Sequence, residues 1–287
     1  MKNRKWTYHL LTVCATELTL FLLGMRVIGR SIDAVIPQLA GIQDAMLYEF
    51  AYWAAYCTLF LLSTAAILLY MRVTDRAVLS RLAPGRGTGR ALAIGSLVGI
   101  GLNLLCVLLA AATGCFTLTF SGFKPLVLPM LLFCFFTCSC EELFCRGYVL
   151  EYLKKRYPIE VAAFAGGVLF IFHHIDNMQY YGFNAFFALN AFLICMLLVL
   201  ITEMTGSIWA AFGVHTLWNF NQQFVMGLPN SGVSSTLSIF RAENAVSGMF
   251  FDPQFGLEGA PGTTLVYLLA IAALLMLLRR RRASAQG

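Results

Sequence analysis

Long apolar stretches separated by short polar connections make up most of the chain. Most of them reach the ~20 residues that an α-helix needs to cross the hydrocarbon of a bilayer. In lipid, a helix is the simplest way for such a segment to satisfy its own backbone hydrogen bonds. The pattern therefore predicts an all-α polytopic membrane bundle of about eight transmembrane helices. The apolar runs lie near residues 8–26, 47–71, 91–112, 125–150, 159–175, 183–204, 206–226 and 263–278.

The first run allows two interpretations. Lys2, Arg4 and Lys5 precede an apolar stretch, as they would in a secretory signal peptide. However, Glu17 interrupts the apolar core, and no small-x-small cleavage site follows it. We therefore expect a retained helix, and a single integral membrane domain over residues 1–287.

Composition agrees with the pattern of apolar runs. Of the 287 residues, 59% are hydrophobic and 12% are charged, whereas a soluble domain carries about 25% charged residues. This excludes an ordinary soluble protein. The nine cysteines lie mostly inside apolar runs without a CxxC pair. They are typical of small buried side chains rather than of a disulfide framework or a zinc knuckle.

The distribution of basic residues predicts the topology. Eight spans place both termini on one side of the membrane, together with 15 of the 20 Lys and Arg residues. Cytoplasmic loops are the ones enriched in Lys and Arg, so we expect both termini to be cytoplasmic. The net charge of +6 is then a topology signal, and it indicates no nucleic-acid partner. The basic segments on this side are 2–5, 72–90, 154–156 and 279–282.

Ionisable side chains at membrane depth are costly and usually functional, and this chain concentrates them in runs four to seven. Residues 139–148 read CSCEELFCRG at the end of an apolar run. Three of the chain's four histidines lie in the following runs. We expect these polar groups to surround an active-site cavity inside the membrane, with residues 125–225 as the catalytic core.

Helix geometry predicts that the polar groups meet. Pro158 breaks the chain between runs four and five. Glu141 lies 17 residues before Pro158 and His174 lies 16 residues after it, so both are ~24–26 Å from the turn at 1.5 Å per residue. His215 and Asn219 are spaced i, i+4 on run seven, so they share one helix face. All four can reach one layer of the bundle.

The two adjacent glutamates have different expected roles. Glu142 and Arg146 form an i, i+4 pair with the acid first, the favourable order for a helix ion pair, which favours a structural role for Glu142. Glu141 points about 100° away and is a candidate general base beside a histidine. A purely structural ion network is the alternative. From spacing alone, either His173 or His174 could be the histidine that faces inward.

Three motifs resemble those of the CPBP intramembrane proteases, a family that includes type II CAAX prenyl endopeptidases and bacteriocin-processing or self-immunity proteins. EExxxR corresponds to Glu141–Arg146, FxxxH to Phe170–His174, and HxxxN to His215–Asn219. Each motif alone is weak in a Phe-rich apolar chain. The ordered set, with each motif on its own helix, is more specific, and it covers roughly residues 125–225.

The resemblance implies a glutamate-dependent membrane endopeptidase. By motif, Glu141 would activate a water with assistance from His174, and His215 with Asn219 would stabilise the oxyanion. Glu142, Arg146 and His173 would support them. We expect no cofactor and no metal. Zinc held by one Glu and two His is a minor alternative, since that ligand set leaves an open position.

The resemblance also bears on substrate and location. We expect membrane lipid around the protein and a peptide or protein substrate, either prenylated or a leader peptide, in a bacterial inner membrane. Two other functions remain open: a non-catalytic immunity or scaffold protein of the same fold, and a proton- or ion-coupled transporter. Transporters often contain inverted repeats, and no repeat is evident here. Loop 227–262 could cover the cavity or could be an ordinary exposed loop.

Overall fold

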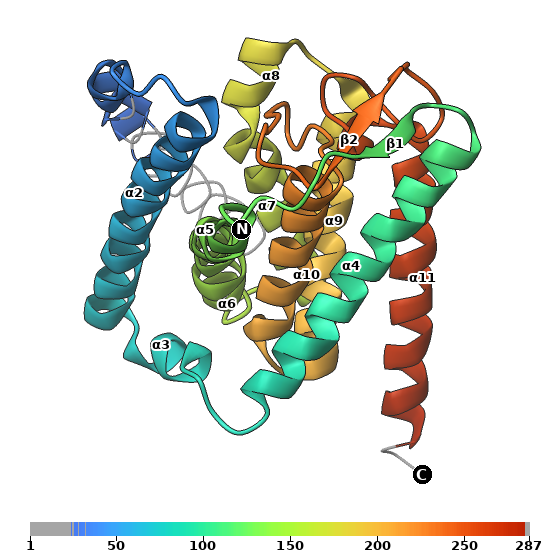
Figure 1. Ribbon diagram of the computed structural model, residues 1–287. Coiled ribbons are helices and arrows are strands. Elements are labelled where there is room, and N and C mark those ends of the chain that lie inside the picture. Colours follow the sequence, from blue (N-terminus) through green and yellow to red (C-terminus); the bar gives the residue numbers. More distant parts are fainter. Residues whose placement is uncertain (1–23, 25, 28, 32, 285–287) are drawn as a thin grey trace.

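The computed structural model describes residues 24, 26, 27, 29–31 and 33–284. The first apolar run therefore lies outside the described residues up to position 23, Glu17 included. Within the described part the chain is a helical bundle with a small two-stranded sheet at one end (Figure 1). The elements are α2 (Ala45–Thr74), α3 (Arg76–Leu82), α4 (Thr88–Ala112), β1 (Thr117–Phe120), α5 (Val127–Glu142), η1 (Leu143–Leu150), α6 (Glu151–Leu153), α7 (Ile159–His173), α8 (Ile175–Tyr181), α9 (Ala185–Thr205), α10 (Ile208–Phe220), η2 (Asn221–Val225), β2 (Phe240–Glu243), η3 (Leu257–Gly259) and α11 (Pro261–Ser284).

Six helical segments of the described part are long and apolar enough to cross a membrane. The prediction of a helical membrane bundle is thereby confirmed, although the count of eight is not. The seventh predicted run became α10 and η2, which are not among the six. Instead, α10 packs against α4, α5 and α9 near the centre of the bundle (Figure 1). The six segments are Ala45–Val73, Thr88–Ala112, Val127–Leu153, Ile159–Tyr181, Ala185–Thr205 and Pro261–Arg281.

Local sequence signals explain where the central helices begin and end. Pro158, with φ −54°, directly precedes α7, because proline suits the start of a helix but not its interior. Gly206 ends α9 in the left-handed conformation, with φ 68°, which glycine adopts without a Cβ penalty. The next residue, Ser207, caps α10 by accepting the Trp209 backbone N–H at 3.3 Å. These two residues reverse the chain between α9 and α10.

Glycines bring α4 and α10 into close contact. A Cβ on Gly95 would lie 2.9 Å from the Cα of Ala210, and a Cβ on Gly99 would lie 2.8 Å from the Cα of Val214. Gly213 does the same from the α10 side, with a Cβ position 2.6 Å from the backbone nitrogen of Ser96. Small residues at i, i+4 let membrane helices approach at backbone distance. The contacts of these three glycines, called the glycine seam below, set the position of α10 against α4.

Hydrogen bonds continue the seam one turn further along. The fully buried Asn103 of α4 accepts a bond from Asn221 Nδ2 at 2.6 Å and donates to Gln222 Oε1 at 3.3 Å. Side-chain amides that bond across helices in this way satisfy one another away from water. The α4–α10 contact is therefore stabilised by the close approach of the two backbones and by the hydrogen bonds of Asn103.

Two helices change to π geometry next to the motif residues. η1 begins directly after Glu142, and η2 begins two residues after Asn219. In η2 the Met226 N–H bonds to the Asn221 carbonyl at 2.8 Å, an i to i+5 bond. π segments are rare and occur frequently at functional sites. Nothing in the apolar pattern of the sequence signals them.

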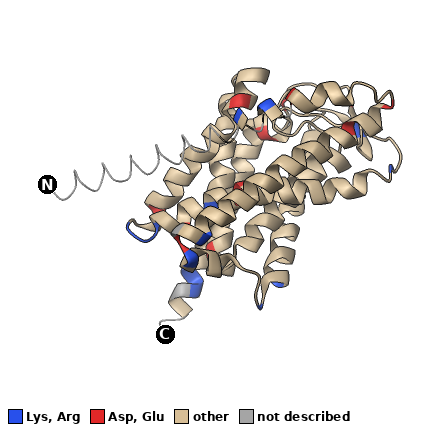
Figure 2. Ribbon diagram, turned by 90° about the vertical axis from the view of Figure 1, so that its left-hand side faces the viewer, with Lys and Arg blue, Asp and Glu red and all other residues tan. Residues whose placement is uncertain are grey.

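The two ends of the bundle differ in charge and in structure. At one end, Lys155 forms an ion pair with Asp75, and Arg281 donates to the Met204 carbonyl at 2.6 Å. At the other end, β1 pairs antiparallel with β2, and residues 227–262 fold over the helix ends. Lys124 holds this loop region through the Thr236 carbonyl at 2.7 Å. Charged residues lie mainly at helix ends and connections (Figure 2), as expected for a chain in lipid.

Candidate active site

Glu141 lies between two histidines inside the bundle. Its Oε1 is 3.1 Å from Nε2 of His173, and its Oε2 is 3.8 Å from Nε2 of His215. The Oε2 atom has no hydrogen-bond partner among the described residues. Helix geometry predicted that Glu141 and the histidine-bearing segments of runs five and seven reach the same depth. In the structure, a histidine from each of these two segments lies next to Glu141.

Glu142, the next residue in the chain, is completely buried. Its Oε1 accepts from Arg146 Nη1 at 3.2 Å, the ion pair expected from the i, i+4 spacing. The same oxygen is 2.8 Å from His215 Nδ1, a contact that the spacing did not predict. The Arg146 guanidinium also lies over the ring of Phe170, 4.8 Å from its centroid. Glu142 thus connects the arginine to a candidate catalytic histidine.

The bond to Glu142 also orients the His215 ring. Because a carboxylate only accepts, Nδ1 of His215 must carry the hydrogen. The other ring nitrogen, Nε2, is then directed toward Glu141. A partner on one ring nitrogen decides what the other can do. Glu142 therefore sets both the orientation and the tautomer of His215.

The adjacent histidines of α7 have different partners. His173, the last residue of α7, is the one at hydrogen-bond distance from Glu141. His174 leaves the helix with φ −100° and ψ 14°, and its Nδ1 bonds to the Phe170 carbonyl at 3.0 Å. A carbonyl can only accept, so His174 Nδ1 is the donor and Nε2 keeps the lone pair in the neutral ring. Both side chains line the same cavity.

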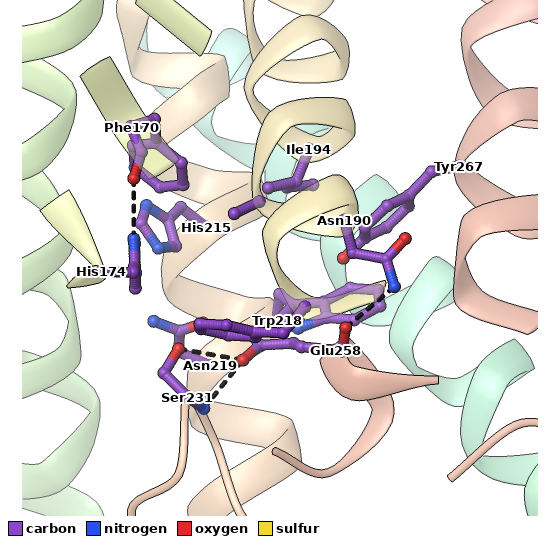
Figure 3. A pocket seen from close by; sticks show the side chains of 12 residues that line it. Phe170, His174, Asn190, Ile194, His215, Trp218, Asn219, Ser231, Glu258 and Tyr267 are labelled. Carbon is purple, nitrogen blue, oxygen red and sulfur yellow. Dashed lines mark hydrogen bonds between the residues drawn. The ribbon is translucent and has the colours of Figure 1, made fainter. Parts of the chain in front are cut away.

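The cavity has two chambers that share His174, His215, Asn219 and Ser231. The polar chamber, of about 660 Å³, contains Glu141, His173 and the amides of Gln223 and Asn230. The apolar chamber, of about 430 Å³, is drawn in Figure 3. The residues that line the apolar chamber are Phe170, His174, Phe187, Asn190, Ala191, Ile194, His215, Trp218, Asn219, Ser231, Glu258 and Tyr267.

Asn219 has a defined amide orientation. Its Oδ1 accepts a hydrogen bond from Asn230 Nδ2 at 3.2 Å, and its Nδ2 is 3.4 Å from the sulfur of Cys138. Cys138 lies on α5, one turn before Glu141. The amide N–H groups of Asn219 therefore point toward the side of the cavity where the glutamates lie.

Loop 227–262 supplies cavity residues that motif reasoning missed. Asn230 and Ser231 line the polar chamber, and Glu258 lines the apolar one. Both oxygens of Glu258 accept hydrogen bonds from these two residues, at distances between 2.8 and 3.4 Å. Of the two interpretations of this loop, covering the cavity is the one that the structure supports. The sequence signal was a lone glutamate in an apolar stretch, FGLEG at 255–259.

Burial has a clear electrostatic effect on Glu258. Because the carboxyl group is shielded from solvent, its pKa is raised above the usual value for glutamate. The hydrogen bonds from Ser231 act in the opposite direction and stabilise the ionised form. Burial has the larger effect.

The described residues contain no group of three or more His, Cys, Asp or Glu side chains placed to hold a metal ion. The contacts already described explain this. His173 is 3.1 Å from Oε1 of Glu141, whereas Nε2 of His215 lies 3.8 Å from Oε2 and Nδ1 of the same ring contacts Glu142. A zinc site with three protein ligands needs each donor ~2.0–2.2 Å from one point. The three side chains, as they lie, do not converge on one such point.

Comparison with known proteins identifies the central segment. No curated protein matches the chain. Residues 123–221, however, match the family model described as type II CAAX prenyl endopeptidase Rce1-like. The matched range nearly coincides with the predicted core at 125–225, and it includes EELFCR, FIFHH and HTLWN. The match confirms the resemblance to the CPBP intramembrane protease family over the segment that carries all three motifs.

Proposed function

We propose that the protein is an intramembrane endopeptidase in which Glu141 activates a water molecule to cleave a peptide bond. The observation that carries the proposal is the placement of Glu141. One of its oxygens is held by His173, while the other has no hydrogen-bond partner among the described residues. The residue lines a polar chamber inside a membrane bundle. The family match independently implies CAAX protease-type chemistry.

The proposed reaction follows from these positions. Glu141 takes a proton from a water molecule, which attacks the carbonyl carbon of the scissile bond. The lone pair on His174 Nε2 assists by accepting a hydrogen bond from the same water. The attack forms a C–O bond and leaves the negative charge on the former carbonyl oxygen. When the C–N bond breaks, Glu141 returns the proton to the leaving amine.

The oxyanion would be stabilised from the α10 side. Asn219 Nδ2 and Nε2–H of a protonated His215 are the proposed donors, and the Glu142 carboxylate supplies the countercharge for that ring. Donors that are fixed before the reaction stabilise developing charge without reorganisation. The glycine seam and Glu142 hold these donors in place. His173, which contacts Glu141 directly, is proposed to orient the base rather than to transfer a proton.

The test is proteolysis in proteoliposomes with the wild type and with Glu141→Gln, Glu142→Gln and His174→Ala. The substrate panel contains a prenylated C-terminal peptide, the same peptide without prenyl, and a leader peptide. Loss of a general base lowers the rate by about 10²–10⁴-fold, so Glu141→Gln should abolish measurable cleavage. Glu160→Gln is the matched control, because Glu160 is exposed on α7. Full activity of Glu141→Gln would refute the proposal.

Two outcomes would favour other functions. If the wild type binds a panel peptide and never cleaves it, the immunity or scaffold function gains support. If cleavage occurs and a strong chelator abolishes it, the metal-free mechanism is wrong and the zinc alternative replaces it. We expect activity to survive chelation.

The proposed location is a bacterial inner membrane with both termini cytoplasmic. What supports the orientation is that the basic segments 72–90, 154–156 and 279–282 gather at one end of the bundle, where Lys155 contacts Asp75 and Arg281 contacts Met204. A membrane-impermeant thiol reagent on single cysteines introduced after Arg281 and in loop 227–262 tests it. The loop cysteine should react from outside the cell and the terminal one should not.

A further inference from the structure

Glu258 is a second carboxylate that lines the cavity, in addition to Glu141, and neither the motifs nor the proposed reaction uses it. It lies in η3, between loop 227–256 and α11. Its own backbone carbonyl accepts from Asn190 Nδ2 at 2.8 Å, which fixes the main chain at this point. Glu258 is half-buried, and a carboxylate withdrawn from water carries a desolvation cost unless hydrogen bonds offset it. Its partners therefore indicate what it does.

The two oxygens of Glu258 have different partners. Oε2 accepts from the Ser231 backbone N–H at 2.8 Å and from the Ser231 hydroxyl at 2.9 Å. Oε1 accepts from Asn230 Nδ2 at 3.4 Å. Ser231 has a positive φ of 49°, which non-glycine residues rarely adopt without compensating contacts. Glu258 thus holds residues 230–231 in an uncommon conformation.

Asn230 links the segment held by Glu258 to the active site. Its Nδ2 also donates to Asn219 Oδ1 at 3.2 Å. An amide nitrogen has two hydrogens, so it can serve Glu258 and Asn219 at the same time. With Oδ1 occupied, the Asn219 N–H groups must face the other way, where Cys138 Sγ is the partner at 3.4 Å. Sulfur is a weak acceptor, so the Asn219 N–H can readily donate its hydrogen bond to an oxyanion instead of to Cys138.

Simple anchoring of the loop does not account for Glu258. Glu49 of α2 already holds the same loop, because it bonds to the Ser235 hydroxyl and accepts from the Thr236 N–H at 2.7 Å. Lys124 adds bonds to the Thr236 and Ser238 carbonyls at 2.7 and 3.0 Å. These anchors lie further along the loop and do not touch Asn219. Among the Glu49, Lys124 and Glu258 side chains, Glu258 is the one whose partner, Asn230, also contacts the proposed oxyanion donor Asn219.

We propose that Glu258 is a positioning residue which, through Asn230, holds the Asn219 amide with its N–H groups aimed at the reacting carbonyl. The inference rests on the proposed function, since it assigns Glu258 to the same catalytic site. It predicts that Glu258 acts on the rate of the chemical step and acts only through Asn219.

Glu258→Gln is the appropriate perturbation because it preserves size and removes one acceptor. A glutamine has one oxygen and one NH₂ group, so either Ser231 or Asn230 must then face a donor instead of an acceptor. Loss of one oxyanion donor costs about 10²–10³-fold in kcat. Glu258→Gln misdirects this donor without removing it. We therefore expect a smaller loss of kcat, at least about 10-fold, with KM nearly unchanged.

The decisive experiment is a double-mutant cycle in proteoliposomes. In the wild-type background Glu258→Gln should lower kcat, and in the Asn219→Ala background it should lower kcat no further. Glu49→Gln is the matched control. It removes the other loop carboxylate and should leave kcat within about twofold. Independent, multiplicative effects of Glu258→Gln and Asn219→Ala would overturn the proposal, as would equal effects of Glu258→Gln and Glu49→Gln.

A measurement that needs no activity separates this inference from the proposed function. If the wild type cleaves no substrate, the proposed function fails on its own. Structures of the wild type and of Glu258→Gln in nanodiscs then test the linkage directly. We expect the contact between Asn219 Oδ1 and Asn230 Nδ2 to be lost in the variant. If that contact remains at hydrogen-bond distance, Glu258 does not position Asn219 and the inference is wrong.

Discussion

The glycine seam between α4 and α10 should control both stability and activity. Gly99 is buried against the backbone of Val214, and an added Cβ would lie 2.8 Å from the Cα of that residue. Carbon atoms pack at about 3.5–4.0 Å, so Gly99→Ala must move the helices apart by about 1 Å. The obstacle is backbone, which cannot rotate away as a flexible side chain could.

The loss of unfolding free energy in Gly99→Ala follows from this displacement. Overpacking of a tight interior costs about 1–3 kcal/mol, and backbone on both sides places Gly99→Ala at the upper end of that range. For a chain of this size, about 3 kcal/mol corresponds to a loss of roughly 6–12 °C in Tm. His215 follows Val214 directly, and its 2.8 Å bond to Glu142 would stretch beyond hydrogen-bond range. A shift of about 1 Å at a reacting group can cost about 10²-fold in rate.

Gly101→Ala on the same helix is the control. Gly101 is exposed, and a Cβ there meets nothing within 4 Å. Alanine is favoured over glycine in a helix by roughly 0.5–1 kcal/mol, so this variant should be as stable as the wild type or slightly more stable. Thermal unfolding in detergent and cleavage in proteoliposomes measure both effects. Equal Tm values and equal rates for the two alanine variants would refute the reasoning.

Three further predictions concern charged groups. Glu142→Gln leaves Arg146 as a buried charge without its counterion and should cost about 3–5 kcal/mol of unfolding free energy. The double variant with Arg146→Met should recover much of that loss in thermal unfolding. Lys155→Ala removes an ion pair with Asp75 at the surface and should change the unfolding free energy by no more than about 1 kcal/mol, and a larger change would mean that the pair is structural. Because burial raises the folded-state pKa of Glu258, its contribution is most favourable below the unfolded pKa and is lost as pH rises through the folded pKa. Glu258→Gln should flatten that decline in Tm measured against pH.

The adjacent glutamates Glu141 and Glu142 have different partners and different proposed roles. Both sit where α5 gives way to η1, yet Glu141 faces the polar chamber and Glu142 faces Arg146 and His215. The ion pair of Glu142 is therefore not only structural, since the same carboxylate orients a proposed catalytic ring. Substitution of Glu142 is expected to lower both stability and rate, whereas Glu141→Gln should affect the rate alone. That contrast is measurable with the variants described above.

The sequence by itself determined the features that depend on local, repeating geometry. Apolar runs predicted the membrane helices because the bilayer requires about 20 apolar residues per span. The fixed rise of a helix placed Glu141 level with the end of α7, and the i, i+4 rule paired Glu142 with Arg146. The three motifs, read in order, predicted the family that residues 123–221 match.

Only the tertiary structure decided the contacts that regular geometry does not govern. His173 and His174 lie where α7 ends, so helical periodicity could not say which of them reaches Glu141. The second bond of Glu142, to His215, depends on how closely α10 packs against α4. Glu258 reaches the cavity from an irregular loop, whose path is set by side-chain hydrogen bonds between distant residues. Such bonds have no sequence period, because they form only once the packed helices bring their partners together.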